Sequence, residues 1–273
     1  MEFFENTSKY IYHYTSVETL VKYILPQKQL LFSPINISND PEESKYHLMQ
    51  AFDDDGKLEE YMKKHFTFTF DVSKEIIRNV KTICFSQDSN VPLTVDMCMG
   101  KGYAKPRMWA QYAKKSTGVC LAFNKENIIE KFNSQYKNTK HFLGNISYGN
   151  QLDYISKHNH ACTLLSSELQ SKTIEEIAAL KINNYFELYY FSKHIDWQTE
   201  NEFRLVIKPQ DTGTTQNYLL IDGALEKIIL GNNFDTTIIP SVKILSNNFE
   251  CKPKIIPFYH NKNNYTFGMP LEY

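Results

Sequence analysis

Strands and helices are interspersed along this chain, as its pattern of apolar and polar positions shows. Short segments that are apolar or alternate in polarity predict strands, whereas apolar residues spaced three and four apart predict helices. Strands are expected at residues 10–14, 29–33, 80–86, 118–123, 142–148, 201–208, 218–221, 227–230 and 254–258. Helices are expected at residues 17–25, 106–115, 168–192 and 235–245, and over most of 42–79 with a break near 53–56.

The order of these elements predicts the fold class. Strands lie among helices of unequal length, without a regular strand–helix alternation, so we expect an α+β fold with a mixed sheet. The chain has 10 Gly and 10 Pro in 273 residues, no Gly/Ser linker and no repeat of fixed period. We therefore expect one domain, residues 1–273, with helical insertions at about 42–79 and 150–192.

Composition and charge exclude several classes of protein. Hydrophobic residues make up 42% of the chain and charged residues 22%, which is ordinary for a globular protein. The net charge of -1 argues against nonspecific attraction to nucleic acid along the whole chain. No run of eighteen apolar residues is present, and residues 1–6 do not resemble a signal peptide. We expect a cytoplasmic protein without a membrane partner.

The five cysteines indicate free thiols rather than a metal centre. They are widely spaced and form no C-x-x-C pair, so neither a disulfide framework nor a structural zinc site is expected. The phosphate-binding loops G-x-G-x-x-G and G-x-x-x-x-G-K-[ST] are absent, as are G-x-S-x-G and H-E-x-x-H. The sequence therefore contains none of the motifs that usually support a Rossmann dehydrogenase, a P-loop NTPase, an α/β-hydrolase or a zincin.

A histidine flanked by aromatic residues is the first candidate functional residue. His13 lies between Tyr12 and Tyr14 on a predicted strand that ends at Thr15 and Ser16. Such a histidine is either a core residue with satisfied ring nitrogens or a hydrogen-bonding group at a strand end. The sequence leaves both readings open. Residues 38–42, Ser-Asn-Asp-Pro-Glu, are read as a turn that begins a helix.

Two carboxylates and an arginine form the second candidate group. Strand alternation over 201–208 puts Glu200, Glu202 and Arg204 on one face. Only three arginines occur among the 30 basic residues, and an arginine fits a planar, bidentate partner such as a carboxylate. The alternative is an ion-paired ladder on the protein surface.

A basic and aromatic segment, residues 101–115, is the third candidate. It carries five basic residues and no acidic one, and we expect Lys105, Arg107, Lys114 and Lys115 to bind phosphate groups of a nucleotide or a nucleic acid. Trp109 within it is interpreted as a core residue. The alternative for the whole segment is an amphipathic helix with solvated lysines.

Taken together, these motifs resemble those of a widespread uncharacterised bacterial family, a domain of unknown function. The resemblance rests on H-Y-T, L-x-F-S, N-D-P-x-E, W-x-x-Y, G-V-C-L-A-F and W-x-x-E-x-E-x-R, and runs from about residue 10 to about residue 235.

A looser resemblance is to the ADP-ribosyltransferase superfamily, with the DarT-type group nearest in pattern. It implies a split sheet with a cleft, and NAD as the donor substrate. In its terms His13 would grip the ribose of NAD beside the hydroxyl of Thr15, Glu202 would be catalytic, and Glu200 would assist it. One of Tyr103, Tyr112 and Tyr148 would stack on nicotinamide. The expected cofactor-binding residues are thus His13, Thr15, Tyr112, Tyr148 and Arg204.

The chemistry of that superfamily suits a fixed carboxylate. Cleavage of the nicotinamide–ribose bond builds positive charge on the anomeric carbon, which a carboxylate stabilises in a water-poor cleft. We therefore expect an NAD-dependent ADP-ribosyltransferase-like protein, for which the resemblance implies a toxin or phage-defence context. The alternatives are a non-catalytic regulatory module that binds a nucleotide or nucleic acid, and an NAD glycohydrolase. The acceptor, which could be a protein or a nucleic acid, and the oligomeric state are open.

Overall fold

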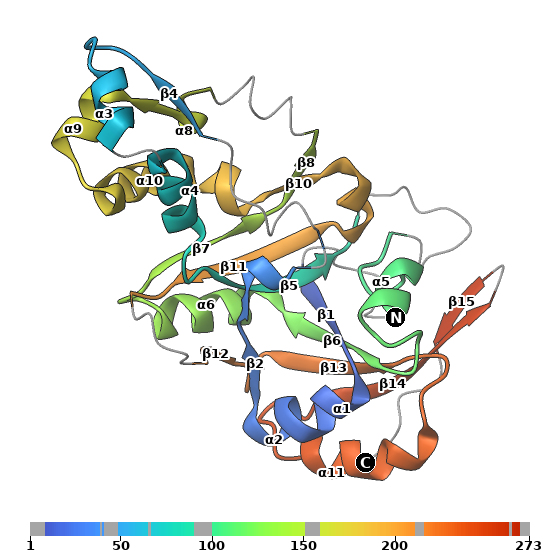
Figure 1. Cartoon of the computed structure of the whole chain (residues 1–273). Helices are drawn as coiled ribbons and strands as arrows, with labels where there is room; N and C mark the ends of the chain where they lie inside the picture. Colours follow the sequence, from blue (N-terminus) through green and yellow to red (C-terminus); the bar gives the residue numbers. More distant parts are fainter. Residues whose placement is uncertain are drawn as a thin grey trace.

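A mixed nine-stranded sheet forms the centre of the molecule. The computed structural model describes residues 9–38, 40, 49–64, 67–89, 100–150, 159–210, 216–261 and 264–267. The strand order is β15-β14-β13-β6-β1-β5-β11-β7, with β3 also paired to β5 (Figure 1). Neighbouring strands are antiparallel except β13 and β14, which are parallel. The predicted α+β class with a mixed sheet is therefore confirmed.

The strands of this sheet are β1 (Tyr10–Thr15), β3 (Ser33–Pro34), β5 (Lys81–Gln87), β6 (Val119–Asn124), β7 (Lys140–Asn145), β11 (Glu202–Lys208), β13 (Leu225–Leu230), β14 (Lys254–Asn261) and β15 (Asn264–Phe267). Three two-stranded pairs lie outside it: β2 (Gln29–Leu31) with β12 (Tyr218–Leu220), β4 (Gln50–Phe52) with β9 (Thr163–Leu165), and β8 (Ser147–Gly149) with β10 (Ser192–His194).

The α-helices are α1 (Val17–Thr19), α2 (Leu25–Gln27), α3 (Leu58–Lys64), α4 (Phe68–Ile77), α5 (Pro106–Gln111), α6 (Lys125–Gln135), α8 (Asn159–Cys162), α9 (Ser166–Ser171), α10 (Ile174–Tyr190) and α11 (Ile239–Ser246). A π-helix, η1 (Leu20–Ile24), joins α1 to α2, and 3₁₀-helices form η2 (Ile35–Ile37), η3 (Ile195–Glu200) and η4 (Thr236–Ile238). In the described parts of the chain, no helix is long and apolar enough to cross a membrane.

The central strands β1 and β5 pair over a short stretch and then separate. They are in register at Ile11–Gln87 and Tyr12–Ser86. By contrast, β1 pairs with β6 along its whole length, Tyr10–Thr15, and β5 pairs with β11 from Lys81 to Ser86. The sheet is thus forked between β1 and β5, and the fork begins next to His13.

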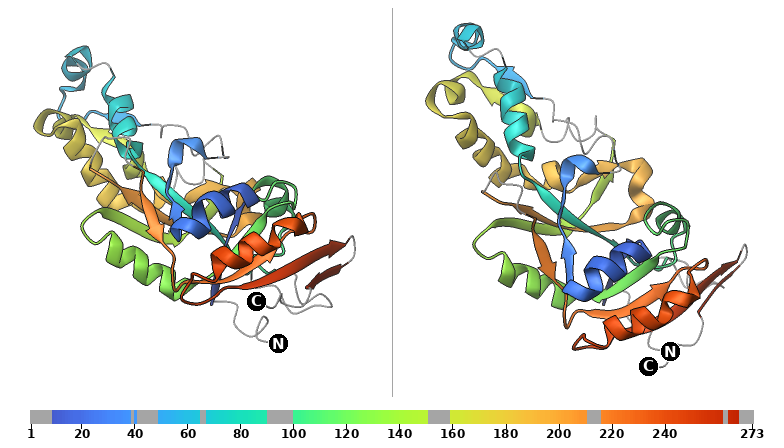
Figure 2. Two further views of the ribbon diagram at one scale, coloured as in Figure 1. Left: turned by 90° about the horizontal axis from the view of Figure 1, so that it is seen from below. Right: turned by 60° about the horizontal axis from the view of Figure 1, so that its bottom comes forward.

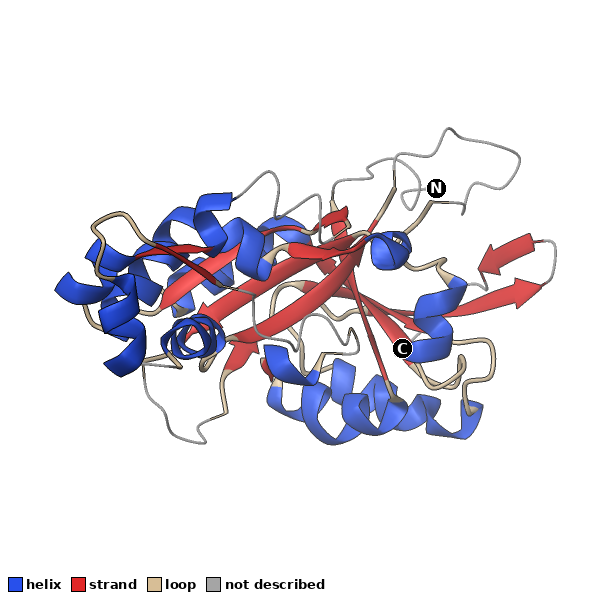
Figure 3. Cartoon of the chain, turned by 45° about the horizontal axis from the view of Figure 1, so that its top comes forward, coloured by secondary structure: helices blue, strands red, loops and turns tan. Residues whose placement is uncertain are grey.

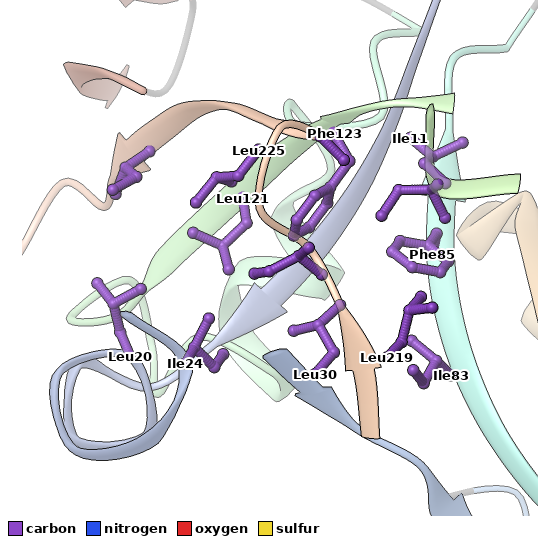
Figure 4. Close-up of a cluster of buried hydrophobic side chains, with 14 of the residues drawn as sticks. Ile11, Leu20, Ile24, Leu30, Ile83, Phe85, Leu121, Phe123, Leu219 and Leu225 are labelled. Atoms are coloured by element: carbon purple, nitrogen blue, oxygen red, sulfur yellow. The ribbon is translucent and has the colours of Figure 1, made fainter. Parts of the chain in front are cut away.

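One face of the sheet carries the main hydrophobic core. Strand residues such as Ile11, Phe85 and Phe123 pack there against Leu20 and Ile24 of η1 (Figure 4). Helices α6 and α11 add Phe132 and Val242 to the same cluster. Figure 2 shows α11 beside the α1–η1–α2 segment on this side of the sheet. Because alternate strand residues point to opposite faces, Phe203, Leu205 and Ile207 of β11 also belong to this core.

The other face is covered by two separate clusters. Near β1 and β6, Tyr12 and Tyr14 pack with Trp109 and Phe258. Near β11, a helical layer of α4, α8, α9 and α10 packs around Val206 (Figure 3). Within that layer the Tyr190 hydroxyl donates to the carbonyl oxygen of Ile76 at 2.7 Å. Segments of the two predicted helical insertions therefore lie against each other.

Several local predictions differ from the structure for identifiable reasons. The helix expected at 168–192 is two helices, because Lys172 is extended and Thr173 caps α10 by accepting from the Glu176 backbone N–H. Gln50–Phe52, expected to be helical, is strand β4 because it pairs with β9. Pro26 does not end the first helix, which continues to Gln27. Part of the Asn-Asp-Pro turn lies outside the described residues.

Two further differences concern α5 and α6. The helix expected at 106–115 ends at Gln111, and Lys114, Lys115 and Ser116 have φ values of 49°, 58° and 66°. Helix α6 was not predicted. Its start is marked by Asn124, whose side chain accepts from the Asn127 backbone N–H at 3.2 Å.

Candidate functional site

A cavity of about 220 Å³ opens in the fork between β1 and β5. Its described wall combines residues of β1, β5, β11, the β2–η2 segment, α5 and its C-cap, β10 and η3. The polar side chains that face it include His13, Cys84, Tyr112, Lys193, Glu200 and Glu202. The β2–η2 segment contributes apolar residues, among them Leu31, Pro34 and Ile37. The cavity thus has a polar wall formed by His13, Lys193 and the two glutamates, and a mainly apolar remainder.

His13 bridges the two strands of the fork. Its Nδ1 atom lies 3.0 Å from the carbonyl oxygen of Cys84, and its ring packs edge-on against Phe85. A carbonyl oxygen can only accept, so Nδ1 carries the proton and Nε2 of the neutral ring is an acceptor. Burial lowers the pKa of His13, although the bond to Cys84 opposes that shift. The half-buried ring is therefore neutral at neutral pH.

The fork between β1 and β5 explains why His13 and Glu202 line the same cavity although they lie on opposite faces of the sheet. Strand register aligns Tyr12, Ser86 and Glu202, so these side chains share one face of the sheet. His13 follows Tyr12 and points to the opposite face. Both nevertheless line the cavity, because the separation of β1 from β5 opens the sheet between its two faces.

The two glutamates are buried in an ionic network rather than exposed in a surface ladder. Lys193 Nζ lies 2.8 Å from Glu200 Oε2 and 3.3 Å from Glu202 Oε2. Arg204 Nε donates to Glu202 Oε1 at 2.6 Å, and the Tyr112 hydroxyl donates to Glu200 Oε1 at 2.9 Å. Glu200, Glu202, Lys193 and Arg204 are each at most 6% exposed. The alternative reading, an ion-paired ladder on the protein surface, is therefore right about the ion pairs and wrong about their exposure.

The two cations keep Glu202 ionised. Burial by itself would raise the pKa of Glu202, but the charges of Arg204 and Lys193 and the bond from Arg204 hold it well below its usual range. The pair of glutamates is balanced by the pair of cations, so the network as a whole is close to neutral. Charge balance of this kind is what permits four ionised side chains to be buried together.

The backbone at Glu200 is the end of η3 and is not part of the strand that contains Glu202, whereas strand alternation had predicted the two on one face of that strand. It ends η3, and the next residue, Asn201, adopts the left-handed conformation with φ 44° before β11 begins at Glu202. The Glu200 carbonyl oxygen accepts from Ser86 Oγ at 2.8 Å and from Lys105 Nζ at 2.7 Å. Glu200 and Glu202 are thus brought together by contacts with β5 and α5, not by strand alternation.

Of the remaining expected cofactor-binding residues, Tyr112 lies in the described cavity wall, whereas Thr15, Tyr148 and Arg204 lie outside it. Thr15 is buried at the end of β1, and Tyr103 is buried in the cluster around Trp109. Tyr148 accepts a hydrogen bond from the backbone N–H of Glu202 at 2.9 Å, and burial raises its pKa. Of the three tyrosines considered for nicotinamide stacking, Tyr112 is the one in the described cavity wall.

Two of the four basic residues singled out in segment 101–115 make contacts with other parts of the protein. Burial lowers the pKa of Lys105 to about 8, although Asp88 and Glu200 oppose that shift. The Arg107 guanidinium lies 4.2 Å from the centre of the Trp197 ring. Lys105 and Arg107 are therefore half-buried and bonded within the protein, whereas Lys114 and Lys115 are exposed. Phosphate or nucleic-acid binding by these four residues stays a prediction.

Trp109 is a core residue, as expected. It is 4% exposed, its Nε1 donates to the Tyr103 carbonyl oxygen at 2.7 Å, and its ring stacks on Phe258.

Sequence reasoning missed Lys193, which is the centre of the ionic network. It is one lysine among many, and it lies near the end of a predicted helix, so no local signal distinguishes it. Cys84 was also missed as a cavity residue, because an exposed cysteine in a central strand is visible only once the fork is known. Among the residues described, no three His, Cys, Asp or Glu side chains are placed to hold a metal ion.

Comparison with known proteins finds a family model that matches the middle of the chain. Residues 108–205 match the model of a family described as a protein of unknown function, DUF2971. The predicted resemblance to an uncharacterised family is thus confirmed for this segment, which contains Tyr112, Lys193, Glu200, Glu202 and Arg204. No curated protein and no solved structure matched the chain. The resemblance to ADP-ribosyltransferases stays a hypothesis.

Proposed function

We propose that the forked-sheet cavity binds NAD and that the protein transfers ADP-ribose from it to an acceptor. The observation that carries this proposal is the composition of the polar wall, where a neutral imidazole acceptor and the carboxylates of Glu200 and Glu202 face one cavity together with Lys193. Because the charges of this wall nearly balance, it favours a ligand that presents hydroxyl groups. The nicotinamide riboside end of NAD presents such hydroxyl groups on its ribose.

The size of the cavity suits one end of NAD rather than the whole molecule. At about 220 Å³ it is smaller than the roughly 300–1,000 Å³ of pockets that enclose drug-sized ligands. We expect the nicotinamide and its ribose to enter, with the pyrophosphate and adenosine outside. Lys114 and Lys115 are exposed cations available to a phosphate.

The chain's own residues would act as follows. NAD supplies the glycosidic bond whose cleavage leaves positive charge on the ribose. His13 Nε2 would accept from a ribose hydroxyl, and Tyr112 would contact the nicotinamide. Glu202 and Glu200 each have two carboxylate oxygens with several lone pairs, so their present partners do not exhaust their acceptor capacity. Their carboxylates would stabilise the developing positive charge.

The binding half of this proposal is tested with His13→Ala against His141→Ala. His141 is a matched control because its Nδ1 also lies near a backbone carbonyl, that of Thr139 at 2.8 Å, and its ring packs edge-on against Phe132, away from the cavity. Loss of one neutral hydrogen bond should weaken NAD binding roughly 3- to 10-fold in His13→Ala, measured by calorimetry. Equal NAD affinity in the two variants would contradict the proposal.

A second measurement places NAD in the cavity. Cys84 lines the cavity and is exposed, whereas Cys251 is exposed elsewhere on the protein. Saturating NAD should slow alkylation of Cys84 and leave that of Cys251 unchanged, as followed peptide by peptide in the mass spectrometer. Nicotinamide release with and without added protein or nucleic acid then separates transfer from simple hydrolysis of NAD.

A second function is favoured by the network itself. Both oxygens of Glu202 and both of Glu200 already have a partner in the protein, and the charges balance. That arrangement suits a scaffold in a non-catalytic nucleotide-binding module. NAD that protects Cys84 without any release of nicotinamide would identify this second function.

A further inference from the structure

Helix α5 contacts the start of η3 through Arg107, in addition to the contacts of Lys105 and Tyr112 with Glu200 at its end. The Arg107 Nη1 atom donates to the Asp196 carbonyl oxygen at 2.8 Å, and its guanidinium lies 4.2 Å from the centre of the Trp197 ring. Arginine is suited to this dual contact, because its planar cation can stack on an aromatic ring and donate from its edge. One side chain of α5 thus contacts two consecutive residues of η3.

Trp197 also contacts Lys193, the cation at the centre of the ionic network. Lys193 Nζ lies 4.9 Å from the centre of the Trp197 ring. It is also the cation shared by Glu200 and Glu202. A continuous set of contacts therefore runs from Arg107, which is not in the described cavity wall, to the three charged residues that are.

The backbone of η3 depends on such external contacts. It is a 3₁₀-helix of six residues, a form with poorer hydrogen-bond geometry than the α-helix. It ends at Asn201 in the left-handed conformation, which asparagine adopts more readily than most residues, and the Asn201 side chain donates to the Asp88 carbonyl oxygen at 2.8 Å. Glu202, by contrast, is held by the β11–β5 pairing. The position of Glu200 relative to Glu202 is thus set from outside η3.

We propose that Arg107 is a positioning residue, which acts through Trp197 and the Asp196 carbonyl to hold Glu200 and Lys193 in the cavity wall. The consequence for turnover rests on the proposed function, whereas the consequence for the structure of η3 does not. Arg107 would then affect the chemical step without contacting NAD.

The test compares Arg107→Met with Arg78→Met. Arg78 is a matched control, since it is a partly exposed arginine that pairs with Glu75 at 2.6 Å and is remote from the described cavity wall. In Arg107→Met, amide hydrogen exchange in residues 195–201 should rise about tenfold, with exchange in β5 and β11 unchanged. Trp197 fluorescence should shift as well, and Trp197→Phe assigns that signal against the buried Trp109.

Turnover separates positioning from a purely structural role. In Arg107→Met, kcat for NAD should fall about tenfold while NAD affinity stays within about threefold, and Arg107→Lys should restore part of the loss. Where Arg107→Met does not fold, Arg107→Lys is used for the exchange measurement.

If the unmodified protein shows no NAD turnover, the proposed function fails, and hydrogen exchange and fluorescence still decide whether Arg107 positions η3. Equal exchange of residues 195–201 in the two arginine variants, or a loss of NAD affinity equal to the loss of kcat, would overturn the positioning role.

Discussion

Glu202 is the residue at which structural and catalytic roles can be separated. Its carboxylate is buried between Arg204 and Lys193, and Arg204 in turn donates to the Tyr190 carbonyl oxygen at 3.0 Å. Removal of one member of a buried ion pair leaves the other charge without compensation. The structural role of Glu202 must therefore be measured before any change in activity is assigned to chemistry.

We predict that Glu202→Gln lowers the free energy of unfolding by about 3–5 kcal/mol. Glu59→Gln is the control, because Glu59 forms an exposed ion pair with Lys63. Urea unfolding at neutral pH measures the difference. A Glu202→Gln protein as stable as the Glu59 variant, with NAD turnover reduced by roughly a hundredfold, would instead indicate a mainly catalytic carboxylate.

The same variant should change the pH dependence of stability. The folded protein lowers the pKa of Glu202 from 4.5 to about 2, so the unfolded chain takes up the proton first as pH falls. The stability contributed by Glu202 is therefore complete above about pH 4.5 and disappears as the pH approaches 2. Glu202→Gln should lack this part of the acid-induced loss, which urea unfolding at pH 2 to 6 can detect.

At the scale of elements, helix ends decide where α9 stops and α10 starts. Thr173 Oγ1 accepts from the Glu176 backbone N–H at 3.2 Å, and Glu176 Oε2 accepts from the Thr173 backbone N–H at 2.8 Å. This reciprocal pair satisfies two N–H groups that a helix start otherwise leaves without a partner. Tyr190 is the last residue of α10, and its carbonyl oxygen accepts a hydrogen bond from Arg204 Nη1.

Thr173→Ala should therefore cost about 1 kcal/mol of stability. Thr67→Ala is the control, since Thr67 lies at the N-cap of α4 without a side-chain bond to the helix backbone. The control should change stability by less than about 0.5 kcal/mol. Thermal unfolding of both variants measures the difference, and equal costs would show that the cap does not stabilise α10.

At the scale of the whole molecule, the helical layer and the forked sheet are joined at the ionic network. Segments from residues 50–77 and 159–191 meet in one cluster that packs on β11. Tyr190 lies at this junction, with its hydroxyl on the Ile76 carbonyl oxygen and its own carbonyl on Arg204. The layer and the candidate site thus share a residue.

Tyr190→Phe should lower stability by roughly 0.5–1.5 kcal/mol, because it removes a buried hydrogen bond between distant segments. Tyr23→Phe is the control, since Tyr23 is 56% exposed. Hydrogen exchange should increase at the carboxyl end of α4 in the Tyr190 variant. A variant indistinguishable from the Tyr23 control would show that this bond does not hold the two segments together.

The sequence by itself determined the central strands of the sheet and most of the candidate residues. Alternating side chains located β1, β5, β6 and β11 to within one or two residues, because strand periodicity is a local property of the chain. It also singled out His13, Glu200, Glu202 and Arg204, which are unusual residues in short, distinctive motifs. The roles of these residues in binding and catalysis stay predictions.

Tertiary structure alone decided how those residues meet. The fork between β1 and β5 and the contact of Arg107 with Trp197 join positions far apart in the chain. Lys193 is seven and nine residues from the two glutamates that it bridges, and the turn of η3 between them brings these side chains together. No local pattern encodes them, because the free energy of a buried charge depends on which opposite charges the whole fold brings beside it.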